Sequence, residues 1–345
     1  MWVNSTNLFD AAAGFGGYKE SGFGREGGRE GMYEYITPDW LKKLPLLESE
    51  PSELSVLPSD SSEPAGIDRT AKLFVGGKQV RPDSGYSYNV LNSRAKSVGT
   101  AGLGNRKDIR NAVEAAVKAS SWGGATAHNR AQVLYYVAEN LSARADEFAL
   151  RLRALGHTPK AAAQEVDLSI GRIFYYAAQA DKYDGRVHAT RSRNVTLAMN
   201  EPFGVMGVLC PDEAPLLGFI SLVMPAIAMG NRVVVVPSSR HPLSATDFYQ
   251  VLETSDMPAG VVNIVTGERE ELAKTLAEHD DVAAVWYYGT RAGCGRVEKF
   301  SAGNLKFTWT NQGRACDWSN ESQGQGEHYL RLSTQIKNIW IPYGE

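Results

Sequence analysis

Cysteine, excess positive charge and long apolar runs are all scarce or missing in this sequence. Three cysteines in 345 residues are too few for a disulfide framework, so a reducing compartment is the simpler expectation. A formal net charge of −3 gives no reason to expect a nucleic-acid partner. No apolar run approaches the ~18 uninterrupted residues that a membrane span needs. We therefore expect a globular protein of the cytoplasm, with no membrane or nucleic-acid partner.

Secretory and metal-binding signatures are absent too. The first ten residues lack the basic region and apolar core of a signal peptide, so the sequons at Asn4, Asn194 and Asn320 are expected to stay unglycosylated. The six histidines show no HExxH spacing and no CxxC pair is present, so no metal site is expected. A GxSxG nucleophile elbow is also missing.

The first seventy residues lack the pattern of a folded domain. Residues 14–24 form a glycine-rich loop, followed by a short helix from about Arg25. That loop does not match the GxxxxGK[ST] phosphate loop. Residues 37–71 hold five prolines among serines and acidic residues, a composition that cannot bury a core. We predict a linker over 37–71, loose attachment of residues 1–70, and rapid proteolysis near residues 45–66.

Regular patterns begin at residue 72. A Gly76-Gly77 turn predicts a hairpin over residues 72–80. Apolar residues at helical spacing predict helices at 106–121, 129–155 and 160–183. Apolar side chains at period two predict a second hairpin at 186–202 whose apolar face suits association with another chain. An extended segment is expected at 329–340.

Between the second hairpin and the terminal segment, predicted strands alternate with predicted helices. Buried strands are expected at 205–210, 232–236, 261–266, 282–288 and 305–310. Helices are expected between or after them, at 216–230, 243–254, 268–278 and 291–302. This order predicts an α/β fold with a doubly wound parallel sheet. Ligands bind beyond the carboxyl ends of such strands, so chemistry is expected at Asp212, Glu213 and residues 236–240.

Several motifs resemble one enzyme family. Residues 15–27 read FGGYKESGFGREG, which resembles the end of the catalytic domain in the aldehyde dehydrogenase superfamily, where FGGxKxSGxGRExG is typical. EPFGV at 201–205, PAIAMGN at 225–231 and PAGVVNIVTG at 258–267 resemble the beginning of another copy. The resemblance implies a variant of the Rossmann fold with an added antiparallel oligomerisation hairpin.

The segment that resembles the end of a catalytic domain comes before the segments that resemble the beginning of another copy. This order resembles the tandem arrangement of aldehyde dehydrogenase family 16, whose members carry a second, degenerate module. The resemblance implies that residues 1–36 are the tail of an incomplete catalytic domain. Residues 72–328 would be a degenerate NAD-binding-like domain that includes the hairpin at 186–202. Residues 329–345 resemble the family's closing oligomerisation strand. Met1 would then open a fragment, an alternative product or an incomplete gene model.

The family's catalytic groups are replaced at the matching positions. An Asn amide, which helps hold the oxyanion formed when a Cys thiolate attacks an aldehyde, corresponds to Glu213. Losing such a donor costs about 2.7–4 kcal/mol. The general base corresponds to Thr310, which has no useful basicity at neutral pH. The nucleophilic Cys is missing, because Cys316 stands too early and beside Asp317, an acid that raises a thiol pKa. Cys210 is expected to be a packing residue.

The family's cofactor contacts are only partly present. A Lys and a Glu that bind the adenosine ribose correspond to Val236 and Ser239, so both polar contacts are lost. Arg240 is either a replacement that meets a phosphate or a solvated loop residue. Tyr288 occupies the position of a family glycine that lies under the cofactor's pyrophosphate. Its side chain is expected to obstruct the approach of the pyrophosphate to the backbone. Three vestigial cofactor-binding positions are retained, Gly267, Thr290 and Gly293. No bound cofactor is expected, and NAD(P) is implied by the resemblance alone.

Three functions stay open on these grounds. The first is a non-catalytic aldehyde-dehydrogenase-like module with a structural, oligomerisation or partner-binding role. It would associate with itself or with a sister module through residues 186–202 and 329–341. The second is part of an NAD(P)-dependent aldehyde dehydrogenase that oxidises aldehydes to carboxylic acids, with the chemistry in another module. The third is a sensor that keeps a nucleotide site.

Overall fold

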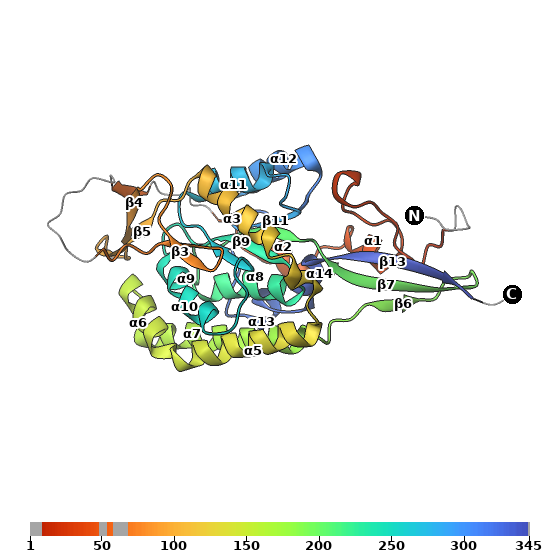
Figure 1. Ribbon diagram of the computed structural model, residues 1–345, viewed down its shortest axis with the longest axis horizontal. Helices are drawn as coiled ribbons and strands as arrows, with labels where there is room; N and C mark the ends of the chain where they lie inside the picture. Colours follow the sequence, from red (N-terminus) through yellow and green to blue (C-terminus); the bar gives the residue numbers. More distant parts are fainter. Residues whose placement is uncertain (1–8, 48–53, 58–67, 344–345) are drawn as a thin grey trace.

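A mixed seven-stranded sheet forms the centre of the molecule (Figure 1). The computed structural model describes residues 9–47, 54–57 and 68–343. In sheet order the strands are β12 (Phe307–Thr310), β11 (Ala284–Tyr287), β8 (Val205–Leu209), β9 (Arg232–Val236), β10 (Val262–Ile264), β2 (Leu73–Val75) and β3 (Lys78–Val80). The first five run parallel, which confirms that prediction. The β2–β3 hairpin, also predicted, extends the sheet antiparallel beyond β10.

Helices cover both faces of this sheet (Figure 1). One face carries α3 (Arg106–Lys118), α11 (Arg269–Glu278) and α12 (Arg291–Ser301). The other carries α8 (Leu217–Ala228), which is covered in turn by α5 (Ala127–Ala143) and α7 (Pro159–Gln179), while α6 (Ala145–Leu155) packs against α7. Every residue of α8 is buried, which explains why its sequence is apolar all round. Two hydrophobic cores result, one on each face of the sheet.

Several predicted helices are shorter or divided in the structure. The helix expected at 129–155 is α5 followed by α6, because Arg144 between them leaves the helical conformation (φ −112°, ψ 14°). The helices expected at 106–121 and 243–254 also divide, into α3 with α4 (Ser121–Gly124) and into α9 (Leu243–Asp247) with α10 (Tyr249–Glu253). Apolar residues keep their spacing on both sides of each bend, so the sequence pattern did not mark the interruptions.

A second, antiparallel sheet of three strands projects from the body (Figure 1). It consists of β13 (Thr334–Pro342), β7 (Asn194–Pro202) and β6 (Arg186–His188) in that order. The hairpin predicted at 186–202 is present as β6 and β7. The terminal segment is extended only from Thr334, because α14 (Glu327–Leu332) precedes it. β13 pairs with β7 of its own chain along the whole strand, and pairing with another chain stays a prediction.

A third sheet was missed by the sequence patterns. It joins β1 (Ser55–Leu57), β4 (Ser87–Leu91) and β5 (Ser97–Gly102). Serine, glycine and asparagine interrupt the apolar residues in these strands, so the apolar–polar alternation is weak, although Tyr88 and Val90 are buried. β1 and the short α2 (Asp39–Lys43) both lie within the predicted linker, so the described parts of that linker have regular structure. Most of the predicted proteolysis region falls outside the described residues.

The N-terminal residues 9–47, which we call the arm, pack against the C-terminal strand. The arm contains the turn η1 (Lys19–Ser21), α1 (Gly28–Tyr33) and α2. Arg25 Nε donates to the Ile336 carbonyl of β13 at 3.0 Å, and the Asn338 amide donates to the Gly14 carbonyl. We expected loose attachment, because the catalytic core that would hold this segment is missing. In the described part, β13 supplies the surface on which the segment docks.

The described ranges contain neither a membrane-spanning helix nor a metal-binding cluster. Among the helices of residues 9–47 and 68–343, none is long and apolar enough to cross a bilayer. Within the same ranges, no three His, Cys, Asp or Glu side chains are grouped so that they could hold a metal ion.

Candidate functional site

A cavity of about 210 Å³ lies beyond the carboxyl ends of the parallel strands. Its walls include six residues that the sequence singled out, Asp212, Glu213, Arg240, Tyr288, Thr290 and Cys316. The structure thus brings these six residues to one cavity, and a functional role for the cavity stays a prediction. Val236, Ser239, Gly267, Gly293 and Thr310 do not line this cavity.

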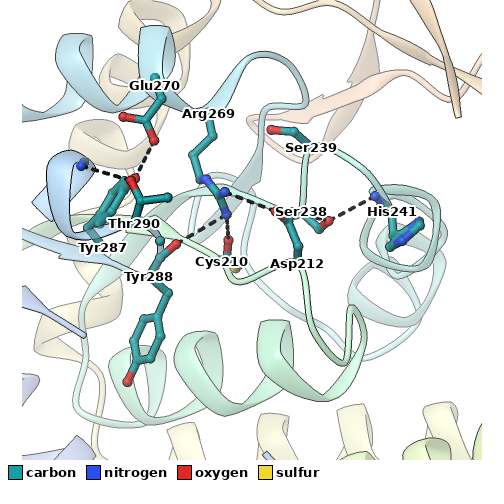
Figure 2. Close-up of polar contacts among 12 residues, drawn as sticks. Cys210, Asp212, Ser238, Ser239, His241, Arg269, Glu270, Tyr287, Tyr288 and Thr290 are labelled. Carbon is teal, nitrogen blue, oxygen red and sulfur yellow. Dashed lines mark hydrogen bonds and ion pairs between the residues drawn. The ribbon is translucent and has the colours of Figure 1, made fainter. Parts of the chain in front are cut away.

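Arg269 bonds to the loops that follow two strands, β8 and β11 (Figure 2). It is the first residue of α11 and only 5% exposed. Its Nη1 donates to the carbonyl oxygens of Cys210 at 3.0 Å and of Tyr288 at 3.3 Å. Its Nη2 forms an ion pair with the Asp212 carboxylate at 3.1 Å. Burial lowers the pKa of Arg269, but Asp212, Tyr287 and Glu270 together more than offset this effect, and the net shift of the pKa is upward.

Sequence reasoning missed Arg269, although one signal was available. A cation at the first position of a helix opposes the helix dipole, so an arginine there needs a specific partner. The partner is Asp212, which also accepts a hydrogen bond from Ser238 Oγ at 2.7 Å. Ser238 Oγ in turn accepts from the His241 backbone N–H at 3.0 Å. The loops after β8 and β9 are thus bonded to each other (Figure 2).

Ser239 and Gly267 likewise make their contacts within the chain. Ser239 is 8% exposed and donates from Oγ to the Gly267 carbonyl at 2.8 Å. Gly267 has φ +153°, and a Cβ there would stand 2.9 Å from the Gly104 carbonyl oxygen. Close approach to Gly104 therefore explains why position 267 is glycine. Val236 is fully buried at the end of β9 and belongs to the core.

The N-terminus of α12 is covered by the chain's own side chains. Thr290 caps this helix, accepting from the Gly293 N–H at 3.2 Å. A Cβ at Gly293 would lie 1.9 Å from Tyr287 Oη, and one at Gly289 would lie 2.5 Å from the same atom. The Tyr287 phenol therefore fills the space over both glycines, and it donates a hydrogen bond to Glu270 Oε1.

The expected obstruction by Tyr288 is wrong in detail, because the obstructing side chain is that of Tyr287. Consecutive residues at a strand end point to opposite faces of the sheet, and the two tyrosines point in different directions (Figure 2). The Tyr288 ring packs against Trp318, with centroids 4.9 Å apart, and against Trp309 at 5.4 Å. Tyr288 is thus part of the core beneath the cavity.

Asn311 ties the loop after β12 to the loop after β11. The side chain is 4% exposed. Its Oδ1 accepts from the Gly289 N–H at 3.2 Å and from Cys294 Sγ at 3.3 Å. Its Nδ2 donates to the carbonyl oxygens of Gly289 at 3.0 Å and of Arg314 at 2.8 Å. Sequence reasoning missed this role, because the partners are mostly backbone atoms and Gly289 lies 22 residues away.

Three residues stand at or near the positions that the resemblance assigns to catalytic groups, Glu213, Thr310 and Cys316. Glu213 is exposed at the cavity. Thr310 is 8% exposed and contacts Glu298 Oε1 through Oγ1 at 3.3 Å. Burial, followed by the charge of Asp317, raises the pKa of the Cys316 thiol to about 12. Cys316 is therefore protonated at neutral pH and a poor nucleophile.

Slow alkylation of Cys316 is the expected consequence. A shift of its thiol pKa from 9.0 to about 12 lowers the thiolate fraction at pH 7.5 about a thousandfold. Iodoacetamide labelling of the native protein, followed by peptide mass spectrometry, measures this rate. In denaturant the same thiol should react like free cysteine, which provides the control. Rapid labelling of native Cys316 at pH 7.5 would contradict the expected protonation state.

Comparisons with known proteins give a consistent picture. A sequence model of the aldehyde dehydrogenase family matches residues 1–41 and 80–313. An aldehyde dehydrogenase of Agaricus bisporus is 32% identical over 242 residues, covering 68% of this chain and 48% of that protein. An NADP/NAD-dependent aldehyde dehydrogenase of Escherichia coli is 28% identical over 252 residues, covering 70% of this chain and 50% of that protein. The chain spans about half the length of these curated relatives.

The solved structures agree with the sequence comparisons. The crystal structure of a putative aldehyde dehydrogenase from Burkholderia cenocepacia superimposes with a TM-score of 0.67 at 29% identity. The match covers 69% of this chain and 50% of the crystallised one. Because the family model matches well over half of the sequence, the chain belongs to the aldehyde dehydrogenase family.

Proposed function

We propose that this chain is a non-catalytic aldehyde-dehydrogenase-like module with a structural, oligomerisation or partner-binding role. One observation carries the proposal. The polar groups at the carboxyl ends of the strands, where a ligand would bind, are bonded to each other through Arg269, Asp212 and Asn311. A ligand at these bonded groups would have to replace bonds that the chain already makes. Two buried atoms of the same cavity, Arg269 Nε and His241 Nδ1, make no hydrogen bond within the described residues.

NAD(P), the cofactor that the family implies, does not fit the residues present. Tyr287 fills the space over the α12 glycines, where a phosphate would need close backbone approach. A Cβ at Gly313 would stand 2.6 Å from the Arg291 N, so the 311–314 loop also covers this helix N-terminus. The cavity of about 210 Å³ is smaller than the roughly 300–1,000 Å³ of pockets for drug-sized ligands. We therefore derive no catalytic step that uses a nicotinamide cofactor.

The proposal also covers the longer protein to which the chain would belong and its association with other modules. The chain would be a portion of a tandem protein of the family 16 type, in which residues 1–36 come from the preceding catalytic domain. Association with a second copy or a sister module would use residues 186–202 and 329–341. Exposed apolar side chains on these strands support an interface there, among them Val187, Met199 and Ile341. All three cysteines are free, which supports a reducing, cytoplasmic setting.

The decisive assay combines activity and binding. We expect the purified chain, mixed with an aliphatic aldehyde and either NAD or NADP, to form no reduced nicotinamide above the protein-free background. Isothermal titration with each nucleotide should show no heat of binding up to millimolar concentration. Aldehyde oxidation that Cys316→Ser abolishes would overturn the proposal. Heat without activity would favour the sensor, and stimulation of a longer tandem form would favour the module of an active dehydrogenase.

A further inference from the structure

Two buried hydrogen-bond donors in the lining of the cavity beyond the strand ends have no acceptor. Arg269 is 5% exposed, Trp318 is 2% exposed, and both side chains line this cavity. Within the part of the chain that the structure describes, Arg269 Nε and Trp318 Nε1 make no hydrogen bond. Both groups can only donate, and a buried donor without an acceptor is destabilising. An acceptor from outside the described residues would satisfy both.

Two further residues of the lining carry polar atoms that a ligand can use. His241 Nδ1 is buried and makes no hydrogen bond to any described residue. Arg314 donates from Nη1 to the carbonyl oxygens of Lys42 and Leu44, and its Nε and Nη2 donors lie outside those two bonds. The polar atoms of the lining therefore come from the loops after β9 and β12 as well as from the start of α11, where Figure 2 shows Arg269.

The charge of the lining favours an anion. Its arginines and carboxylates are Arg240, Arg269, Arg314, Asp212 and Glu213. Three positive and two negative charges leave one positive charge in excess, because burial lowers the pKa of His241 and keeps its ring neutral at pH 7. Asp212 is engaged by Arg269 at 3.1 Å. Glu213 is exposed to solvent, where salt screens its charge.

The size of the cavity restricts the ligand to a small one. Its volume of about 210 Å³ lies below the roughly 300–1,000 Å³ of pockets for drug-sized ligands. Tyr287 covers the nearby α12 glycines, which keeps a dinucleotide from that helix N-terminus. Neither Arg269 nor Trp318 stands at a position that the resemblance assigns to the cofactor. Guanidinium donors match the oxygens of phosphate and carboxylate groups, and both groups are small enough for the cavity.

We infer that this cavity binds a small oxyanion, inorganic phosphate or a short-chain carboxylate, whose oxygens accept hydrogen bonds from Arg269 Nε and Trp318 Nε1. Arg314 adds positive charge at the same cavity. The anion uses atoms that take no part in the Arg269–Asp212 ion pair, so the bonds between the loops stay in place. The inference goes beyond the proposed function and does not rest on it, because anion binding requires neither NAD(P) nor catalysis.

An NMR titration of the full, ¹⁵N-labelled chain tests the inference. The indole N–H signals of its seven tryptophans are recorded at constant pH while sodium phosphate or sodium acetate is added, and triple-resonance spectra assign them. We expect a saturable shift of the Trp318 signal with at least one anion, because the indole N–H gains an acceptor. Saturation by phosphate alone identifies a tetrahedral ligand, and saturation by acetate alone identifies a carboxylate.

Trp286 is the internal control of this titration. Its Nε1 is also buried and makes no hydrogen bond within the described ranges, but the residue does not line the cavity. Its signal should stay unchanged. A Trp318 signal that does not shift with either anion would mean that water satisfies the donors, and it would overturn the inference. Equal shifts of both signals, or the same shift with sodium chloride at equal ionic strength, would overturn it too.

Trp318→Phe and Trp286→Phe form a matched pair for isothermal titration with the anion that shifts the signal. Each substitution removes one buried indole N–H and keeps an aromatic ring. Trp318→Phe is expected to weaken anion binding about tenfold, because a hydrogen bond to a charged acceptor is lost. Trp286→Phe should bind like the unaltered chain, and urea unfolding verifies that both variants are folded.

Equal anion affinity in the two variants would contradict the part that Trp318 plays and overturn the inference. The nicotinamide assay and the nucleotide titrations of the proposed function use other ligands. Failure of the anion site is therefore distinguishable from failure of the proposed function.

Discussion

Arg269→Ala is expected to lower the free energy of unfolding by about 3 kcal/mol, near the lower end of the range for breaking a buried ion pair. The substitution leaves the Asp212 carboxylate without its cation and the carbonyls of Cys210 and Tyr288 without their donor. The lower end applies because the Asp212 side chain is 24% exposed, whereas that of Arg269 is only 6% exposed. Urea unfolding followed by tryptophan fluorescence measures the effect.

An exposed ion pair and a double variant provide the controls for Arg269→Ala. Arg81 forms an ion pair with Asp68 in which the two side chains are 73% and 39% exposed, so Arg81→Ala should cost no more than about 1 kcal/mol. The double variant Arg269→Ala with Asp212→Ala should be less destabilised than the sum of the single variants, because no charge is left unpaired. A loss for Arg269→Ala as small as that for Arg81→Ala would show that the bridge does not hold these loops together.

The fold was predictable where burial leaves a local pattern. The runs in β8 and β9 are apolar at nearly every position and bounded by glycine or proline, as buried parallel strands require. The β4–β5 pair was missed because its burial depends on a few residues such as Tyr88, with polar neighbours between them. Arg144 breaks a helix whose apolar face resumes immediately, and local spacing cannot record such a bend.

The candidate site was predictable in position but not in content. The resemblance implies that Glu213 and Thr310 stand where the family has an amide and a general base. It did not show what fills the space instead. Whether Tyr287 or Tyr288 covers the α12 glycines depends on which face of the strand end each occupies, and one residue reverses that face. Arg269 meets Asp212 across 57 residues of sequence, a contact that no spacing rule contains.

The internal bonds at the strand ends have a structural explanation. An open sheet leaves polar backbone groups at the carboxyl ends of its strands, and these groups need partners when they are buried. In a dinucleotide-binding sheet the ligand can provide some of them. Here Arg269 serves the carbonyls after β8 and β11, and Asn311 serves both backbone groups of Gly289. The crevice is thus stabilised without a ligand.

Asn311→Ala should test this explanation with an effect of about 3 kcal/mol in the free energy of unfolding. The truncation removes the partners of the Gly289 N–H, the Gly289 carbonyl and the Arg314 carbonyl. Each buried group left without a partner costs about 1–3 kcal/mol, and the lower figure applies because the loop can relax toward water. Chemical denaturation and the midpoint of thermal unfolding measure the loss.

Thr310→Val is the matched control for Asn311→Ala, because it changes the adjacent buried residue and removes one hydrogen bond of 3.3 Å. Its cost should stay below about 1 kcal/mol. Neither variant should gain affinity for NAD, since Tyr287 still covers the α12 glycines. If Asn311→Ala were as mild as Thr310→Val, the loop after β12 would not depend on that amide. If it bound NAD tightly, the amide would be a barrier to the cofactor and the site itself would be intact.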